Sequence, residues 1–321
     1  LEGLKKEYDG LFIGCGYGRS RMMNIEGEEF ASDGLEFLDR LGVGEKISYV
    51  GTTAIVGGGN AAIDVARTLV RLGAAPVIVY RRRIQDMPAF EPEVAMAVGE
   101  GVRIMELVTP IRIRETAGDR SSSAPGYELS LHKMKVYQKE TSGRARVIPD
   151  GETTETIHVQ NIFVAIGADA DSLWQFPDSE AANSPVLSHC HFFDQKKPLI
   201  YGGDLTSPVK SVADAIASGK QAAMALDTYF EHGAEAIEKM LTGCRIGAGP
   251  ALSMDVYLGK DRKNRTAQVV SSDEIVTDYF QPAARRVPSI LDAGQRRRSF
   301  RVIVSTLYDT AAGDEAARCF N

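Results

Sequence analysis

Three consecutive glycines, Gly57, Gly58 and Gly59, separate a short apolar segment from a stretch whose apolar residues have helical spacing. Gly57 would let the backbone turn sharply, and Gly59 leaves no side chain to hold a pyrophosphate away from the backbone. Ala62, at the third position of the fingerprint, lets the helix pack close to the strand. The pattern predicts a dinucleotide-binding turn, with an ordinary glycine-rich loop as the alternative.

The helix after the glycines would supply the rest of the phosphate site. Asn60 and Ala61 open it, and their backbone N–H groups, at the positive end of the helix dipole, would bind the pyrophosphate. Gly73 ends the helix, as glycine commonly does after a last helical turn. An apolar strand at residues 76–80 comes next. The order is therefore β-α-β, as in a parallel sheet.

Three arginines, Arg81, Arg82 and Arg83, come directly after this second strand. An acidic residue here would bind the adenine-ribose 2′-hydroxyl of NAD, whereas arginine accommodates the 2′-phosphate of NADP. Guanidinium groups match phosphate oxygens in geometry and charge. We therefore predict NADPH rather than NADH, with Arg81 and Arg82 as the contacts. The alternative is a solvated basic turn that binds nothing.

Small residues end two other predicted strands, and a Gly-Gly-Asp corner ends a third. These residues are Gly14, Cys15 and Gly16, then Ala165, Ile166 and Gly167, then Gly202, Gly203 and Asp204. Such strand ends let a backbone pass close to a cofactor, or simply pack tightly. A carboxylate at a strand end can bind a sugar hydroxyl. The helix that Ser211 opens, with Asp214 three residues on, offers its first amides to an electron-rich ring edge.

The bulk composition is that of a globular protein. With 321 residues the chain can hold two domains of ordinary size. The net charge of −6 argues against nucleic acid as the main partner, and no apolar run reaches the roughly 18–20 residues that cross a bilayer. The start of the chain has no signal segment, which predicts a cytoplasmic protein, and no methionine, which leaves open that it is a piece of a longer one.

The cysteines form no recognisable site. They are Cys15, Cys190, Cys244 and Cys319. No two of them make a CxxC pair, so we predict neither a redox-active dithiol nor a metal or iron–sulfur ligand set. Reduced, mostly buried thiols are the favoured interpretation.

Further elements frame these motifs. Helices are predicted at residues 30–41, 93–98 and 211–230, and a strand at 157–168. Beyond residue 243 the periodicity weakens. Residues 243–308 are therefore predicted to be an extended arm that packs along another surface, followed by a short helix near residues 311–318.

The motifs, in this order, resemble the small subunit of NADPH-dependent glutamate synthase and its FAD/NAD(P)H oxidoreductase relatives. They read YDGLFIGCG, TTAIVGGGNAAIDVARTLVRLGA, VIVYRRR, NIFVAIGA and LIYGGDLTSPVKSVADAIASGKQAA. The resemblance covers residues 7–230 with few breaks. It implies an α/β fold in which a Rossmann-like NAD(P)H-binding domain is inserted in an FAD-binding domain.

The resemblance also implies domain limits and roles. Residues 1–47 correspond to the first segment of the C-terminal part of the FAD domain, 48–165 to the NAD(P)H-binding domain, 166–242 to the return of the FAD domain, and 243–321 to an extended arm or linker. It places Asp204 on the FAD ribityl chain and Val212 near the pyrimidine edge of the isoalloxazine, with Ser211 and Ala215 also at the cofactor.

The sequence departs from the family in what it lacks. The family's FAD domain begins with its own glycine fingerprint, which is absent here, so the predicted FAD domain is incomplete. Either the chain is a fragment or another polypeptide supplies the rest. The arm resembles that of longer iron–sulfur flavoproteins, among them the flavoprotein partner of dissimilatory sulfite reductase, in which an RCxxC-type run opens a cluster domain. Here a single cysteine, Cys319, remains. 4Fe-4S clusters are therefore expected only in missing parts or partner chains.

The resemblance implies an NAD(P)H:acceptor oxidoreductase of the glutamate synthase small-subunit type. A hydride would pass between nicotinamide and FAD, and single electrons would go to iron–sulfur centres of a larger enzyme or complex. The expected partners are a nicotinamide dinucleotide, FAD, the remainder of the FAD domain and an iron–sulfur protein or domain; a homodimer stays open. The cofactors carry the chemistry, so we nominate neither a catalytic residue nor a metal ligand.

Two other functions share these motifs. A disulfide reductase of the thioredoxin-reductase type uses the same two domains, but it needs a CxxC pair next to the flavin. A non-catalytic nucleotide-binding subunit of a larger redox complex is the alternative that the incomplete FAD domain leaves open.

Overall fold

The chain forms two compact units, each made of two separate segments. The computed structural model describes residues 1–116, 126–138, 145–171, 187, 189–193, 197–247, 249–260, 276, 278 and 283–318. The first unit consists of Leu1–Arg19 and Asp169–Gln281, and the second of Ser20–Ala168 and Pro282–Asn321. The second unit is thus inserted in the first, and it also receives the C-terminal segment.

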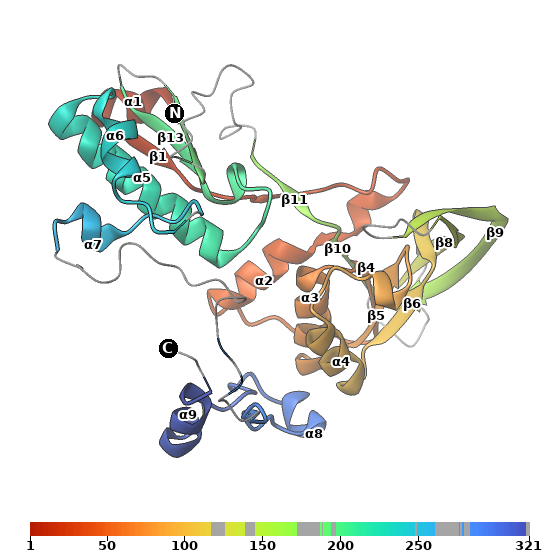
Figure 1. The fold of residues 1–321 in the computed structure, drawn as a ribbon. Helices are drawn as coiled ribbons and strands as arrows, with labels where there is room; N and C mark the ends of the chain where they lie inside the picture. The colour runs from red at the N-terminus through yellow and green to blue at the C-terminus, as the bar shows by residue number, and fades with distance from the viewer. Residues whose placement is uncertain are drawn as a thin grey trace. The chain divides into compact units, whose positions relative to one another are not determined.

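A parallel sheet of five strands forms the centre of the second unit, in the order β3-β10-β4-β5-β6 (Figure 1). The strands are β3 (Ser32–Asp33), β10 (Asn161–Ala165), β4 (Thr52–Gly57), β5 (Ala75–Tyr80) and β6 (Arg103–Glu106), and the helices after β3, β4 and β5 are α2 (Gly34–Gly42), α3 (Asn60–Arg71) and α4 (Glu91–Gly99). Strands β4 and β5 pair in parallel, with Ala54 beside Val77. The predicted α/β class and the β-α-β order around the triple glycine are therefore confirmed.

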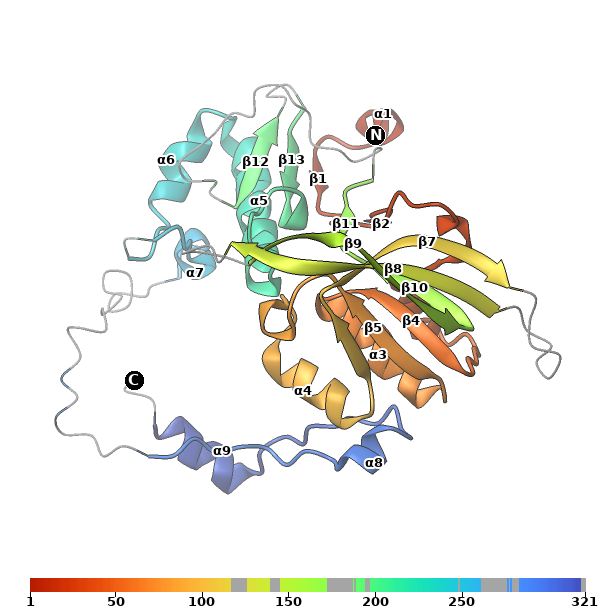
Figure 2. The same ribbon diagram turned by 90° about the vertical axis from the view of Figure 1, so that its right-hand side faces the viewer.

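Alternate residues of the central strands face two different cores, because successive side chains of a strand point to opposite faces. Ile55 and Ile78 pack with the helices. Ala54, Val56 and Val79 pack with residues of an antiparallel sheet, whose strands are β7 (Val108–Thr116), β8 (Gly126–Gln138) and β9 (Arg146–Val159). The second unit thus has three layers: helices, parallel sheet and antiparallel sheet (Figure 2). Each fully buried isoleucine stabilises this arrangement by about 1.5–3 kcal/mol.

Two elements are shorter than the sequence pattern predicts, and a side chain explains each. The helix expected over residues 30–41 begins only at α2, because Asp33 Oδ1 accepts a hydrogen bond from Leu35 N at 2.7 Å and so caps it. The strand expected over residues 157–168 is interrupted at Gln160, whose Oε1 accepts a hydrogen bond from Thr52 N at 2.7 Å. Strand β9 therefore ends before Gln160 and β10 begins after it.

The first unit has a small sheet with strand order β1-β13-β12. Strands β1 (Leu11–Ile13) and β13 (Leu199–Gly202) are parallel, and β12 (Cys190–Phe193) is antiparallel to β13. Ile200 and Cys190 pack with apolar residues of α5 (Val212–His232) and α6 (Ala236–Thr242). The predicted cap of α5 is present, because Ser211 Oγ accepts a hydrogen bond from Asp214 N at 3.1 Å.

Short elements complete the described part of the chain. Strands β2 (Arg19–Ser20) and β11 (Ala168–Asp169) pair where the chain passes between the units. The remaining elements are α1 (Glu2–Glu7), η1 (Glu28–Phe30), η2 (Ile84–Asp86), η4 (Gly203–Leu205), α7 (Met254–Tyr257), α8 (Ala293–Arg296) and α9 (Asp309–Ala316). Helix α9 corresponds to the short helix predicted near residues 311–318.

The unit limits differ from the domain limits expected at 47/48 and 165/166. Residues 20–47 belong to the second unit, because β3 pairs with β10 and Gly34 of α2 lies against the Val164 carbonyl. The predicted arm is also divided: Cys244 and Leu252 pack in the core of the first unit, whereas residues 283–318 belong to the second. Assignment of the units to FAD and NAD(P)H stays a prediction.

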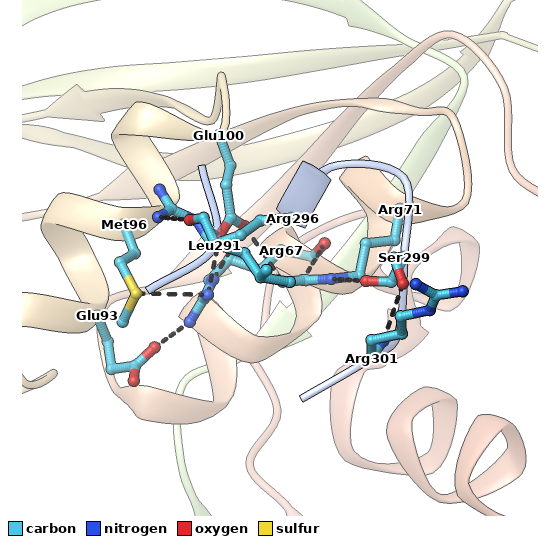
Figure 3. A network of polar contacts seen from close by, with 9 residues as sticks. All are labelled: Arg67, Arg71, Glu93, Met96, Glu100, Leu291, Arg296, Ser299 and Arg301. Carbon is cyan, nitrogen blue, oxygen red and sulfur yellow. Dashed lines mark hydrogen bonds and ion pairs between the residues drawn. The ribbon is translucent and has the colours of Figure 1, made fainter. Parts of the chain in front are cut away.

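A buried carboxylate, Glu100, joins α3, α4 and the C-terminal segment of the second unit (Figure 3). Its Oε1 accepts hydrogen bonds at 2.9 Å from Arg67 Nη2 and from Arg296 Nε, and its Oε2 accepts one at 3.0 Å from Arg67 Nε. Arg71 Nη2 lies 3.5 Å from Oε2. Burial alone would raise the pKa of this carboxyl, but the bonds and charges of these arginines outweigh burial and lower the pKa.

We predict that Glu100→Gln lowers the free energy of unfolding by about 3 kcal/mol, because Arg71 then loses the carboxylate that it faces and Arg67 keeps only Glu93, which is partly exposed. A carboxyl with a lowered native pKa adds stability above its ordinary pKa of 4.5 and loses that contribution as the pH falls through the native pKa. The difference between wild type and variant should therefore shrink below about pH 4.5. Urea denaturation at several pH values measures it.

The exposed pair between Arg40 Nη2 and Glu45 Oε1, 2.5 Å apart, provides the control. Glu45→Gln should change stability little, because exposed ion pairs contribute little. If Glu100→Gln and Glu45→Gln lowered the free energy of unfolding equally, the buried Glu100 network would contribute no more to stability than an exposed ion pair.

Candidate functional site

The triple-glycine turn joins β4 to α3 at the carboxyl end of the parallel sheet. Gly57 has φ +148°, and a Cβ atom there would lie 2.2 Å from the carbonyl oxygen of Ala165. Only glycine fits this position, because the backbone conformation and the close neighbour both exclude a side chain. Ala62 is fully buried beside it. The turn is therefore pressed against the end of β10, and helix and strand are as close as the fingerprint requires.

Gly58 and Gly59 have opposite surroundings. A Cβ atom on Gly58 would lie 2.4 Å from the Tyr80 ring, which is fixed by a 2.9 Å hydrogen bond from Tyr80 Oη to the carbonyl of Asp86. A Cβ atom on Gly59 would meet nothing within 4 Å. The backbone at Gly59 is therefore open to the close approach of a ligand, which is the role the sequence predicts for it.

Helix α3 begins at this open glycine. Gly59 is its N-cap, and no side chain of the described residues caps its first turn. The first N–H groups, those of Asn60 and Ala61, are thus left to a ligand or solvent. The Asn60 side chain is engaged elsewhere: its Oδ1 accepts a hydrogen bond from Phe90 N at 3.0 Å. The turn can therefore offer backbone donors and a positive dipole end to an anion.

The other small-residue motif of this unit lies beside the turn. Ala165 is the register partner of Gly57 in the β10–β4 pair. Ile166 is exposed, and the carbonyl of Gly167 accepts a hydrogen bond from Arg21 N at 3.0 Å. The structure therefore brings the residues predicted at the ends of β4 and β10 to one edge of the sheet.

The three arginines after β5 have different surroundings. Arg81 is exposed. Arg82 is half-buried, and its Nε donates to the Ala145 carbonyl at 2.9 Å. Arg83 makes two hydrogen bonds to Asp86, at 2.7 and 3.0 Å, and these lower the pKa of the Asp86 carboxyl. Arg82 is thus already held by the protein, Arg81 is not free of contacts either, and sequence reasoning missed the Arg83–Asp86 pair.

In the first unit, the ends of β1 and β13 lie side by side. Ile13 is the register partner of Tyr201, and the glycines beyond them reach the same corner: a Cβ atom on Gly16 would lie 4.0 Å from Asp204 Cβ. Gly14 directly follows β1, and Cys15 is exposed. The structure therefore brings Gly16, at one predicted small-residue strand end, close to Asp204 of the Gly-Gly-Asp corner.

A buried side chain binds the backbone of this corner. Ser218 of α5 is fully buried, and its Oγ accepts a hydrogen bond from Gly203 N at 2.7 Å. Gly203 has φ +63°, and a Cβ atom there would meet nothing within 4 Å. The sequence analysis missed Ser218, because its only sequence signal is one serine within a helical pattern.

The Asp204 carboxylate is half-buried, and within the described part of the chain it accepts no hydrogen bond and forms no ion pair. Lys210 binds backbone groups of the loop that follows Asp204. Its Nζ donates to the Ser207 carbonyl at 2.7 Å and to Tyr17 Oη at 3.1 Å, and it also contacts the Asp204 carbonyl. Asp204 is thus a rigidly placed acceptor that is available to a hydroxyl group.

The start of α5 presents the remaining predicted residues. Val212 is 77% exposed, and Ala215, one helical turn on, is also exposed. Asp214 binds Ser211 and lies 3.6 Å from His189 Nδ1, so both polar side chains near the helix start are engaged. His189 was missed by sequence reasoning. The exposed first turn offers backbone N–H groups beside apolar surface.

The described cysteines and acidic residues do not form a metal site. Among the described residues, no group of three or more His, Cys, Asp or Glu side chains could hold a metal ion. Cys190 and Cys244 are buried, and burial raises the pKa of the Cys190 thiol to about 12. Cys319 lies outside the described residues. No helix in the described ranges is long and apolar enough to cross a membrane.

Comparisons with known proteins show what the chain is similar to. A family model described as pyridine nucleotide-disulphide oxidoreductase matches residues 2–188. The chain is 30% identical over 241 residues to the NADP(+)-dependent formate dehydrogenase subunit beta of Moorella thermoacetica, covering 73% of this chain and 33% of that one. It is 34% identical over 177 residues to the NADPH-Fe(3+) oxidoreductase subunit beta of Geobacter sulfurreducens, covering 53% of this chain and 26% of that one.

The glutamate synthase (NADPH) small chain of Escherichia coli is 28% identical over 254 residues, covering 72% of this chain and 52% of that one. This match confirms the resemblance drawn from the motifs. The chain spans between about a quarter and a half of the length of these three relatives.

Gly59→Ala tests the open turn. A methyl group there meets no protein atom and costs the helix cap at most about 1 kcal/mol, but it would occupy the space through which a pyrophosphate approaches the backbone. We expect the Kd for NADPH, measured by titration calorimetry, to rise at least about ten-fold. Gly42→Ala, which also meets nothing within 4 Å, is the matched control. If the Kd for NADPH were unchanged in the Gly59 variant, the turn would not be part of the binding site.

Proposed function

The chain belongs to the pyridine nucleotide-disulphide oxidoreductase family, and on that basis we propose that it is an NAD(P)H-dependent flavoprotein oxidoreductase module. When bound, the two cofactors supply the chemistry: nicotinamide exchanges a hydride with FAD, and single electrons pass on to iron–sulfur centres of a larger enzyme or complex. We assign the second unit to the nicotinamide dinucleotide and the first unit to FAD.

The observation that carries this proposal is the geometry of the triple-glycine turn. Its first glycine is forced by the contact with the Ala165 carbonyl, whereas Gly59 faces open space at the start of a helix that no described side chain caps. A turn needed only for packing would have no reason to leave Gly59 unobstructed. Backbone N–H groups and the dipole of α3 would bind the diphosphate there.

The FAD assignment is supported by the corner of the first unit. The Asp204 carboxylate is available as an acceptor, and the Gly203 backbone is unobstructed. These residues fit a flavin, since Asp204 would bind a ribityl hydroxyl, and the exposed first turn of α5 would face the ring edge. The protein would thus supply alignment and a fixed electrostatic environment.

NADPH is the proposed nicotinamide nucleotide, with Arg81 as the main contact to the 2′-phosphate and Arg82 as the second. Arg81 is exposed directly after β5, where the 2′-phosphate of NADP lies in this class of fold. Arg82 already donates to the Ala145 carbonyl through Nε, which leaves its Nη groups for a phosphate. The relatives' names, which include NADP(+) and NADPH, support this choice.

Single-electron transfer to a partner is the remaining part of the proposal. Two of the relatives are named as beta subunits and one as a small chain, which supports a place in a larger assembly. The iron–sulfur acceptor is inferred from the sequence resemblance. We place any 4Fe-4S cluster in that acceptor.

Absorption spectroscopy tests the flavin. We expect the purified protein, or the protein incubated with FAD, to show flavin bands that bleach on anaerobic addition of NADPH. Asp204→Ala should retain clearly less flavin after gel filtration, because a ribityl hydroxyl loses its acceptor, whereas Asp9→Ala, at an exposed site in the same unit, should retain it. A colourless protein that binds NADPH but not FAD would instead show a nucleotide-binding subunit.

Arg81→Ala tests the nucleotide preference. Loss of one charge-assisted contact to the 2′-phosphate should raise the KM for NADPH by about ten-fold or more, and leave the KM for NADH nearly unchanged. Arg83→Ala serves as the control, because Arg83 is already paired with Asp86. Equal changes in both KM values would show that Arg81 does not contact the 2′-phosphate.

A further inference from the structure

The C-terminal segment, residues 283–318, is anchored on the helices of the second unit (Figure 3). Arg296 donates to Glu100 Oε1 and, through Nη1, to the Leu291 carbonyl at 2.8 Å. Arg71 Nε donates to the Ser299 carbonyl at 3.2 Å. Residues 296 and 299 are therefore tied to Glu100 after α4 and to α3, and the residues from 300 onward start from a fixed position on this unit.

Residues 289–291 and 303–305 form a short antiparallel pair. Leu291 N donates to the Ile303 carbonyl and Ser305 N to the Ser289 carbonyl, both at 2.9 Å. In this pattern the backbone groups of Val304, opposite Ile290, point away from the partner segment. Among the described residues, neither Val302 nor Val304 makes a backbone hydrogen bond. This strand therefore has an unpaired edge.

Residues 300–305 also expose apolar side chains. Phe300 is 60% exposed, Val302 83% and Val304 37%. The same side chains line one wall of a groove of about 470 Å³, whose other wall includes Asp64 and Thr68 of α3. A long apolar edge left in solvent is a template for pairing with another chain.

Positive charge accompanies this edge. Arg298 and Arg301 are exposed, and within the described ranges neither guanidinium group has an acidic partner. In Figure 3 the Arg301 side chain extends away from the Glu100 network. The groove lining also includes one carboxylate, Asp64, and two arginines, Arg67 and Arg71, that already pair with Glu100. The excess positive charge that a ligand meets at residues 300–305 therefore comes from Arg298 and Arg301.

We propose that residues 300–305 are a docking edge for an acidic partner protein. The partner would add an extended segment to the free edge, with main-chain hydrogen bonds to Val302 and Val304 and apolar side chains at alternate positions. Its carboxylates would pair with Arg298 and Arg301. The surface does not overlap the glycine turn or the Asp204 corner, so its failure would leave the proposed hydride transfer untouched.

A fluorescein-labelled peptide, Asp-Val-Glu-Val-Thr-Val-Asp, serves as the probe for the full chain. We expect saturable binding by fluorescence anisotropy, weakening with added salt because exposed charges are screened. In hydrogen exchange, the amides of Val302 and Val304 should become protected when the peptide is present. A peptide with lysine in place of the three acidic residues is the matched control ligand and should bind at least about ten-fold more weakly.

Two variants locate the site. Val302→Asp and Arg301→Glu both change exposed side chains, so folding should be kept, and circular dichroism checks it. Each should weaken peptide binding at least about ten-fold. Val43→Asp, at a position in the same unit that is 79% exposed, should have no effect.

Three results would overturn the proposal. One is absence of peptide binding to the wild type. Another is equal binding by the Val302 and Val43 variants, which would place the peptide elsewhere. The third is concentration-dependent dimerisation of the wild type that Val302→Asp abolishes, because the edge would then pair with a second copy of the chain rather than with an acidic partner.

Discussion

The contact between Gly57 and the carbonyl of Ala165 is the constraint on which the second unit depends. Because glycine has no side chain at this contact, strands β4 and β10 can stay paired in register as far as Gly57 and Ala165. Helix α3 can then begin at Asn60, directly after the turn. The same closeness leaves Gly59 as the first unobstructed backbone. A packing requirement at one glycine thus leaves an unobstructed backbone two residues later, at the end of a helix that is favourable for anions.

Ion pairs with Glu100 hold the opposite end of α3 in place. Arg67 and Arg71 lie one helical turn apart, and both meet the buried Glu100 beyond α4. Burying three or four charges is unfavourable unless each finds a partner with good geometry, and here the C-terminal segment contributes one of the partners through Arg296. The network therefore sets the positions of α3 and of residues 296–299 together.

In the first unit, other contacts position the residues that we propose to bind a cofactor. Two strand ends meet at Gly16 and Asp204, and a buried serine on α5 holds the Gly203 backbone. Lys210 fixes the loop behind the carboxylate. Neither proposed site relies on a nucleophile or a general base from the protein.

The sequence by itself determined the local features: the β-α-β unit around the glycines, the helix that Ser211 caps, and the small residues at strand ends. These features depend on spacing and on backbone preferences within a few residues, and the family resemblance came from their order. The tertiary structure alone decided that Gln160 interrupts a strand by binding Thr52, that Arg82 is held by Ala145, and that Arg296 reaches Glu100. These contacts join residues that lie 63 to 196 positions apart in the chain. No local pattern predicts such pairs, because they depend on which surfaces the folded chain brings together.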